Sequence, residues 1–289
     1  MLVHRRRNTP ARTAGQHAPA STVTLSAGAR SHATNRETRG NVREARYPRW
    51  QTRFMPTDER FDVPLYSVTE AARHLDVPVS TFRTWVHGYE RRPEGKRPVT
   101  GAPIVTTLPR DAGVSVPFIG LAEAHALAAI RGAGVPLQRI RPALDLLQQQ
   151  LGIEHVLASR SLYTDGAELL YDFAEREGDT PEARSVRELV VVRNGQRVFN
   201  EVVESYLRRV EFAGDGWAER IHLRKYGNAD VVVDPRRSFG IPIFARGAVR
   251  LETVIAAFKA GTDIDGLTAE YGVPRDVLLS VLRVHTEAA

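Results

Sequence analysis

The 289-residue sequence contains no cysteine. This excludes a disulfide framework, a thiol nucleophile and a zinc site with thiolate ligands. It fits a reducing cytoplasm, where we expect the protein to reside. No run of about 18 uncharged apolar residues occurs, so no segment could cross a bilayer as a helix and we expect no membrane partner. Lysine is scarce: the 40 basic side chains include only Lys96, Lys225 and Lys259. Codon bias in a GC-rich genome explains this as well as selection for arginine does, and we prefer the codon explanation.

Several motifs of catalytic and metal sites are also missing. The nine histidines show neither the H-x-x-x-H nor the H-E-x-x-H spacing that places two metal ligands on one helix face. There is no P-loop, no complete G-x-G-x-x-G fingerprint and no G-x-S-x-G nucleophile elbow. Gly132 and Gly134 form a lone G-x-G without a preceding strand, which indicates a turn between helices. We therefore expect no catalytic residue, no cofactor, no metal and no enzyme activity, although two-carboxylate hydrolysis stays open.

Positive charge is concentrated at the N-terminal end. Residues 1–58 contain eleven arginines against Glu37, Glu44 and Asp58, a balance of +8, whereas the rest of the chain balances at −2. The segment has little apolar periodicity, so we expect a disordered basic tail. Patterned sequence begins just after Met55, and our expectation is that translation starts there. A tail that is translated would be a non-specific phosphate binder.

Two short helices are predicted after the tail. Ser67, with Glu70 three residues further on, has the pattern of a capping box that begins the first helix. Pro78 keeps the residue before it out of the helical region, so this helix ends there. Ser80 is expected to cap a second helix, Thr81–His87. Two helices of about two turns joined by a tight turn form a helix-turn-helix.

The outer side of the second helix predicts DNA recognition. Its apolar residues share one face, and its polar residues lie off that face. In a helix-turn-helix such a polar edge enters the major groove, where hydroxyl, guanidinium and imidazole groups reach base edges and phosphates. The alternative is an ordinary helical hairpin in a core, which needs no polar edge. The predicted DNA-binding residues of this helix are Ser80, Thr81, Arg83, Thr84 and His87.

A basic loop follows the second helix. Ile104–Leu108 is rich in β-branched residues and is predicted to be a strand. A basic loop that leads into a strand directly after a helix-turn-helix indicates a wing, whose charges hold the phosphate backbone rather than specify sequence. On charge alone, a solvated loop explains the segment equally well. The predicted backbone-binding residues are Arg91, Arg92, Lys96 and Arg97.

A pair of amphipathic helices is predicted at Phe118–Arg131 and Leu137–Leu151. His125 lies on the apolar first helix, so we expect it in the core or at its rim. The order of helix-turn-helix, basic wing and helix pair around residues 121–141 (LAEAHALAAIRGAGVPLQRIR) resembles the MerR-type winged helix-turn-helix. In that family the helix pair packs behind the DNA-reading unit. The long dimerisation helix and the ligand-sensing cysteine of its metal-responsive members are missing, so the resemblance implies no metal sensing.

The remaining chain predicts a second small domain. Residues 152–173 suggest a short strand or turn and a short helix, and the charged segment 176–187 is the best candidate for a linker. Asn194-Gly195 between apolar runs predicts a β-hairpin with a type I′ turn. A helix is expected at Asn200–Val210, and Val231–Val233 is expected in a small sheet. Three further helices are predicted at Leu251–Ala260, Ile264–Tyr271 and Arg275–His285.

Five short motifs occur in order in this second part: Val233-Asp-Pro235, Phe239-Gly-Ile-Pro-Ile243, Ala245-Arg-Gly247, Ala260-Gly261 and Ala269-Glu-Tyr-Gly272. Over about residues 228–285 they resemble a compact antitoxin-like helix-turn-helix family of bacterial proteins. Taken with the MerR-like half, the chain resembles the long VapB-type antitoxins, which pair with PIN-domain ribonuclease toxins.

This resemblance implies a function. It implies a DNA-binding antitoxin that neutralises a VapC-type PIN-domain toxin and represses its own operon as a homodimer on operator DNA. It also implies an arginine inserted among the carboxylates of the Mg²⁺-binding ribonuclease site of the toxin; the sequence does not identify that arginine, so the toxin-binding residues are unknown. The alternatives are a winged helix-turn-helix transcriptional regulator without a toxin partner, and an interaction scaffold that has lost DNA binding.

The expected fold is mainly α with small β elements, of the α+β class. We predict a basic tail at residues 1–58, a MerR-like winged helix-turn-helix domain at 59–175, a linker at 176–187 and an antitoxin-like domain at 188–289. The last domain is expected to combine a β-hairpin with a three-helix bundle.

Overall fold

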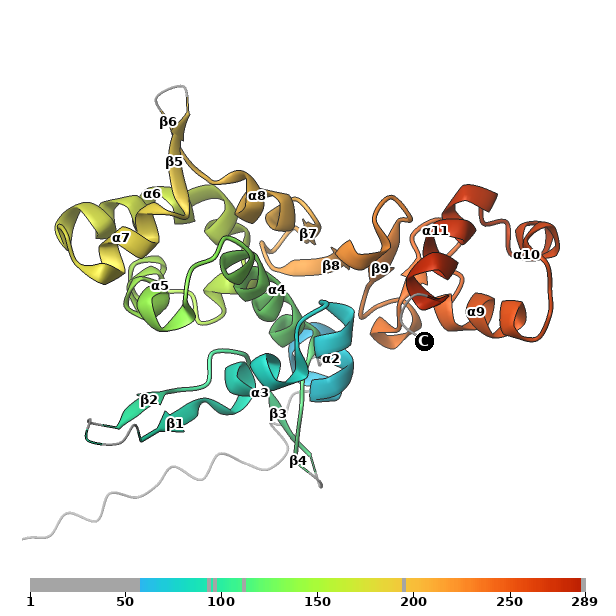
Figure 1. The fold of residues 1–289 in the computed structure, drawn as a ribbon, viewed down its shortest axis with the longest axis horizontal. Helices are drawn as coiled ribbons and strands as arrows, with labels where there is room; N and C mark the ends of the chain where they lie inside the picture. The colour runs from blue at the N-terminus through green and yellow to red at the C-terminus, as the bar shows by residue number, and fades with distance from the viewer. Residues whose placement is uncertain (1–57, 93–94, 96–97, 111–112, 194–195, 287–289) are drawn as a thin grey trace, which may run out of the picture. The chain divides into compact units, whose positions relative to one another are not determined.

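The computed structural model is shown in Figure 1. The chain separates into residues 1–52 and residues 53–289, and every described residue belongs to the second unit. The predicted tail, with its alternative start at Met55, therefore lies outside the described residues up to position 57. The described residues are 58–92, 95, 98–110, 113–193 and 196–286.

Helices alternate with short antiparallel strands, which confirms the expected mixture of mainly α structure with small β elements. Within the described ranges, no helix is long and apolar enough to span a membrane. The same residues contain no group of three or more histidine, aspartate or glutamate side chains placed to hold a metal ion.

The first part contains three short helices and two hairpins. The helices are α1 (Glu59–Asp62), α2 (Val68–His74) and α3 (Val79–His87). The hairpins pair β1 (Tyr89–Arg91) with β2 (Val99–Gly101), and β3 (Leu108–Arg110) with β4 (Gly113–Ser115).

Longer helices follow the hairpins. The side chains from Phe118 to Ile130 in the first of them are all buried, so this helix is the centre of the core. The next helix has the bounds that its apolar spacing predicted. The elements are α4 (Phe118–Gly132), α5 (Leu137–Leu151), η1 (Val156–Ala158), α6 (Arg160–Arg176) and α7 (Pro181–Arg187).

The second part begins with the predicted hairpin, β5 (Val190–Arg193) with β6 (Gln196–Phe199), although its Asn194-Gly195 turn lies outside the described residues. Helix α8 (Glu201–Leu207) then leads into an antiparallel sheet in the order β10-β9-β8-β7. Two short 3-10 turns, η2 (Arg224–Tyr226) and η3 (Ser238–Gly240), lie in its connections. The strands are β7 (Val210–Phe212), β8 (Ala218–His222), β9 (Val231–Val233) and β10 (Ile243–Phe244).

Three helices complete the chain, as the sequence predicts: α9 (Leu251–Lys259), α10 (Ile264–Tyr271) and α11 (Arg275–Thr286). Asp263 caps α10, because its side chain accepts a hydrogen bond from the Gly266 amide at 2.7 Å. Leu278 and Val281 of α11 are fully buried, while Leu279 remains 42% exposed.

Two predictions around α3 are wrong. Ser80 does not cap this helix, because α3 begins at Val79 and Pro78 occupies the N-cap position. The fixed φ of proline already suits the start of a helix. Residues Ile104–Leu108 do not form a strand, because the amides of Ile104 and Val105 both donate to the carbonyl of Trp85, at 2.9 and 3.2 Å. Only Leu108 belongs to a strand, β3.

Three further segments also differ from the prediction. The short elements expected within residues 152–173 are largely one helix, α6, in which Gly166 lies close to Leu162 and the Phe199 ring. This glycine permits close packing and does not interrupt the helix. Part of the predicted linker is helix α7, whose Ala183 and Val186 are fully buried. Helix α8 ends at Leu207, and strand β7 takes the end of the expected helix. The domain boundaries themselves stay a prediction.

Candidate nucleic-acid interface

The first helix of the helix-turn-helix, α2, has the predicted capping box. The Glu70 amide donates to the Ser67 hydroxyl at 3.2 Å, and the Ser67 amide donates to the Glu70 carboxylate at 2.8 Å. The turn after α2 needs a left-handed residue, which is Asp76 with φ 56°. The Val77 amide then donates to the Ala72 carbonyl at 2.9 Å, which closes the turn and directs the chain into α3.

Helix α3 is attached to the core by one face. Phe82, Trp85 and Val86 are each at most 3% exposed, and the rings of Phe82 and Trp85 lie 5.8 Å apart. Burial of this apolar face stabilises α3 against α2 and leaves its other side to solvent.

The structure places the five predicted DNA-binding residues of α3 on its solvent side. Ser80, Arg83 and His87 are exposed, and Thr81 and Thr84 are half-buried. Their spacing of three and four residues puts them in one stripe along the helix. The Thr84 hydroxyl donates to the Ser80 carbonyl at 3.0 Å, so its remaining capacity toward a ligand is as an acceptor. The stripe has the access that groove reading requires; the role of each residue stays a prediction.

The structure also brings α4 and α5 next to this stripe, which the sequence did not predict. Thr81 and Thr84 border a hollow that Arg131, Gln138 and Arg141 also line. Arg131 follows the apolar run of α4, and Gln138 lies in the first turn of α5; both are exposed. The polar residues beside the G-x-G turn were the available signal, but the sequence alone does not show that the turn lies beside α3.

The basic loop after α3 is a hairpin, formed by β1 and β2. Gly88 connects it to α3 with φ 73°, and a Cβ there would lie 2.3 Å from the Gly101 carbonyl oxygen. Only glycine fits this position without displacing the backbone. Arg91 lies in β1, and Arg92 is exposed with its guanidinium 2.8 Å from Glu90. Lys96 and Arg97 lie outside the described residues.

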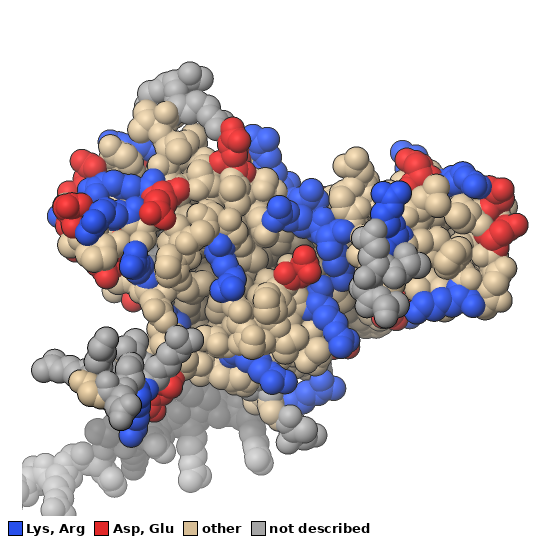
Figure 2. All heavy atoms as spheres, viewed as in Figure 1, with Lys and Arg blue, Asp and Glu red and all other residues tan. Residues whose placement is uncertain are grey.

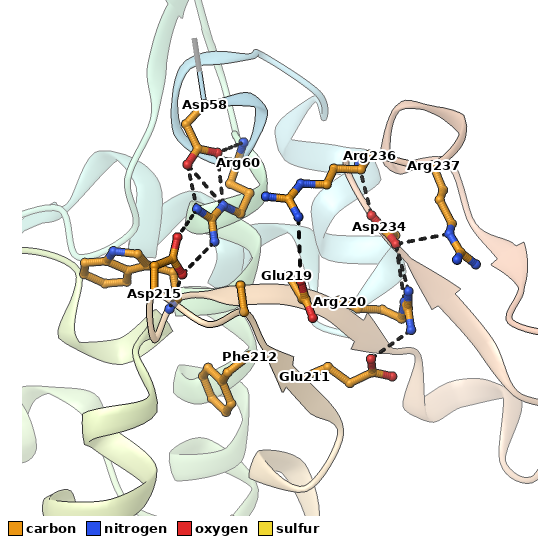
Figure 3. A network of polar contacts seen from close by, with 12 residues as sticks. Asp58, Arg60, Glu211, Phe212, Asp215, Glu219, Arg220, Asp234, Arg236 and Arg237 are labelled. Carbon is orange, nitrogen blue, oxygen red and sulfur yellow. Dashed lines mark hydrogen bonds and ion pairs between the residues drawn. The ribbon is translucent and has the colours of Figure 1, made fainter. Parts of the chain in front are cut away.

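A polar network joins the segment before the helix-turn-helix to the second part of the chain (Figure 3). The Arg60 side chain is only 4% exposed and binds the carboxylates of Asp58 and Asp215 at 2.6 and 2.5 Å. Nearby, Arg220 contacts Asp234 at 3.1 Å. The Tyr66 hydroxyl also donates to the Gly240 carbonyl at 2.9 Å in a buried position. The helix-turn-helix is therefore held by residues more than 100 positions away in the sequence.

The buried His125 and the half-buried His74 remain uncharged at neutral pH. Burial lowers the pKa of His125 to about 4, and the nearby positive charges of Arg209 and Arg224 contribute to the decrease. Its Nε2 lies 2.9 Å from the Tyr206 carbonyl oxygen, so the side chain is a hydrogen-bonded core residue, as predicted. Burial and the charge of Lys225 lower the pKa of His74 to about 4.

Comparison with known proteins also identifies a helix-turn-helix domain in this chain. Residues 64–144 match a family model described as "Putative DNA-binding HTH domain". The chain is 50% identical over 226 residues to "Putative antitoxin VapB45" of Mycobacterium tuberculosis, which covers 77% of this chain and 94% of that protein. It is also 25% identical over 224 residues to an uncharacterised protein of the same organism, Rv2308, covering 76% of this chain and 89% of that one.

A solved structure is similar as well. The X-ray crystal structure of Rv2018 from Mycobacterium tuberculosis matches with a TM-score of 0.68 and 46% sequence identity, over 77% of this chain and 99% of that chain. The domain match confirms a helix-turn-helix of a DNA-binding type, and it includes α2, α3, both hairpins, α4 and the first half of α5.

Proposed function

The chain belongs to the family of the relative named "Putative antitoxin VapB45", and on that premise we propose that it is a DNA-binding antitoxin that represses its own operon and neutralises a PIN-domain ribonuclease. The observation that supports DNA binding most directly is the exposed polar stripe of α3 within the matched helix-turn-helix domain. The name of the relative supports the toxin partner. The protein acts by binding and not by catalysis.

DNA recognition follows from the arrangement of α2 and α3. Helix α3 lies in the major groove, where Arg83 can bind a guanine edge with two hydrogen bonds and the hydroxyl groups can contact bases or phosphates. The hairpin after Gly88 contacts the phosphate backbone through its arginines. A homodimer then recognises two half-sites of a pseudo-palindromic operator.

Neutralisation of the toxin requires a contact other than the one that binds DNA. A PIN-domain ribonuclease holds Mg²⁺ with carboxylates, so an arginine is the side chain that can occupy this site with two parallel hydrogen bonds. Among the exposed candidates in the second part, Arg246 and Arg250 have no carboxylate within 4.0 Å in the described part of the chain. We propose that the toxin binds this part and leaves α3 free for DNA.

The test of the DNA claim is the double variant Arg83→Ala/Thr84→Ala, measured on the duplex upstream of the chain's own gene. Each lost base contact should weaken binding by ~1–3 kcal/mol, which is roughly 5- to 150-fold. Arg184→Ala on α7 is the matched control, because Arg184 is exposed and lies outside the matched domain. Unchanged affinity of a folded double variant would show that α3 does not read the operator.

The test of the toxin claim begins with the neighbouring gene. A PIN-domain protein encoded beside this chain should co-purify with it and lose ribonuclease activity in the complex. A helix-turn-helix regulator without a toxin partner would instead bind the duplex and leave the ribonuclease active.

A further inference from the structure

Four basic residues outside the α3 stripe lie together around the junction of α2 with the second part. Arg73 is on α2, Arg209 lies between α8 and β7, and Arg224 and Lys225 are on η2. Figure 2 shows lysine and arginine side chains in a band over α8, β8 and α2. We call these four residues the basic band.

Specific contacts hold two members of the basic band in place. The Lys225 ammonium donates to the Arg73 carbonyl oxygen at 3.0 Å, which fixes η2 against α2. The Arg224 guanidinium lies 4.5 Å from the centre of the Tyr206 ring and donates to its hydroxyl group. These contacts limit the movement of the side chains, and their partners are a backbone carbonyl and a tyrosine rather than a carboxylate.

Two arginines close to the basic band in the sequence form ion pairs with carboxylates, unlike the members of the band. Arg208 is 2.5 Å from Glu204, and Arg220 binds both Glu211 and Asp234. Within the described residues, no carboxylate lies within 4.0 Å of a basic-band side chain. The positive charge of the band therefore remains available to an external anion.

Both burial and charge act on the groups in and around the basic band. Burial lowers the pKa of Lys225, and Arg73 contributes to the decrease while Asp76 opposes it. Positive charges of the band also help to lower the pKa values of His74 and His125. A bound polyanion would offset the positive charges that act on these two histidines.

The chemistry of the band favours a nucleic-acid backbone over a protein. Protein interfaces have a core of apolar and aromatic side chains, with the charged residues at the rim. The band offers charged groups, and the Arg224 guanidinium covers the Tyr206 ring. The contact between Lys225 and Arg73 also makes the band continuous with the helix-turn-helix.

We propose that Arg73, Arg209, Arg224 and Lys225 form a second phosphate-binding surface, which contacts the backbone of duplex DNA beside the segment read by α3. This inference rests on the proposed DNA-binding function and extends it to the second part of the chain. The band contributes affinity and salt dependence without base specificity.

The experiment measures the salt dependence of binding for Arg209→Gln/Arg224→Gln, on the duplex upstream of the chain's own gene and on a scrambled duplex of equal length. If each arginine neutralises one phosphate, the slope of log K against log salt should decrease in magnitude by about 1.8. Affinity for both duplexes should decrease by the same factor, roughly tenfold or more at about 0.1 M salt.

Two further variants make the test specific. Arg208→Gln is the matched control, because Arg208 precedes Arg209 in the sequence but is paired with Glu204, and its slope should equal that of the wild type. Arg209→Lys/Arg224→Lys keeps both charges and should restore the wild-type slope, which separates loss of charge from loss of structure. Circular dichroism of each variant confirms folding.

The outcomes separate this inference from the proposed function. If the wild type does not prefer its own upstream duplex, the proposed function fails. If the wild type prefers that duplex and the glutamine variant keeps the wild-type slope, only the basic band is refuted. Loss of toxin binding with an unchanged DNA slope would assign the band to a protein interface and would also overturn the inference.

Discussion

Replacement of Asp215 by asparagine tests how strongly the buried Arg60 joins the two parts of the chain. Asp215 accepts from both terminal nitrogens of Arg60, at 3.1 and 2.5 Å, and from the Trp217 amide at 3.0 Å. Asparagine retains one acceptor oxygen, so the paired geometry with Arg60 and the negative charge are both lost. Asp58 remains as the second partner of Arg60, at 2.6 Å.

The loss of stability expected for Asp215→Asn follows from the pKa shift of the Asp215 carboxyl group. Arg60 lowers the pKa of Asp215 from 3.8 to about 2, and a shift of nearly two units corresponds to ~2.5 kcal/mol. The Asp215 side chain is 46% exposed, so solvent screening reduces the expected loss on substitution to ~1 kcal/mol.

The pH dependence gives the prediction its sign. Because the folded pKa lies below the unfolded value, the stabilisation is complete above about pH 4 and is lost as the pH falls toward 2. Urea unfolding should therefore show a difference between Asp215→Asn and wild type at pH 7 that shrinks over this range. Asp179→Asn is the control, because Asp179 is 88% exposed and its ion pair with Arg184 should contribute nothing measurable. Equal stability of Asp215→Asn and wild type at pH 7, or a difference that persists at pH 2, would refute the reasoning.

Two further predictions concern the core and the hairpin. In His125→Gln, the fall in stability from pH 6.5 toward pH 4 should be smaller than in the wild type, because the folded state disfavours protonation of the buried imidazole. The largest contribution of this imidazole to the fall in stability is ~3 kcal/mol. Urea titrations that show the wild-type pH profile for His125→Gln would contradict this prediction. In Gly88→Ala, the left-handed φ of 73° and the 2.3 Å approach to the Gly101 carbonyl oxygen should cost ~1–3 kcal/mol and displace the hairpin after α3. Its thermal unfolding midpoint should fall, whereas Gly95→Ala, a position with φ 70° and no atom near the added Cβ, should lose less.

Local chemistry explains which elements the sequence could predict. The capping box of Ser67 and Glu70 and the apolar spacing of α5 act within one helix, so both were predicted correctly. The polar stripe of α3 was predicted for the same reason, since the buried Phe82 and Trp85 determine which side faces outward.

The wrong secondary-structure predictions occur where residues far away in the sequence determine the local structure. Ile104 appears suited to a strand, but the Trp85 carbonyl takes its amide hydrogen bond. Glycine disfavours a helix interior, yet Gly166 lies within α6, where the nearby Leu162 and Phe199 side chains favour a small residue. The basic band and the residues Arg131 and Gln138 beside α3 could not be predicted, because their proximity depends on tertiary packing.

The burial of α4 on all sides has a consequence for any fragment of this protein. One part of α4 packs against α1 and η1, and another part packs against α8, where His125 meets the Tyr206 backbone. A chain cut after Arg176 would leave the part of α4 that packs against α8 open to water, at the energetic cost of an uncovered apolar surface and an orphaned imidazole. The two ends of the molecule are thus expected to unfold cooperatively. On the proposed function, one proteolytic cut between α6 and α8 would then abolish DNA binding and toxin binding together.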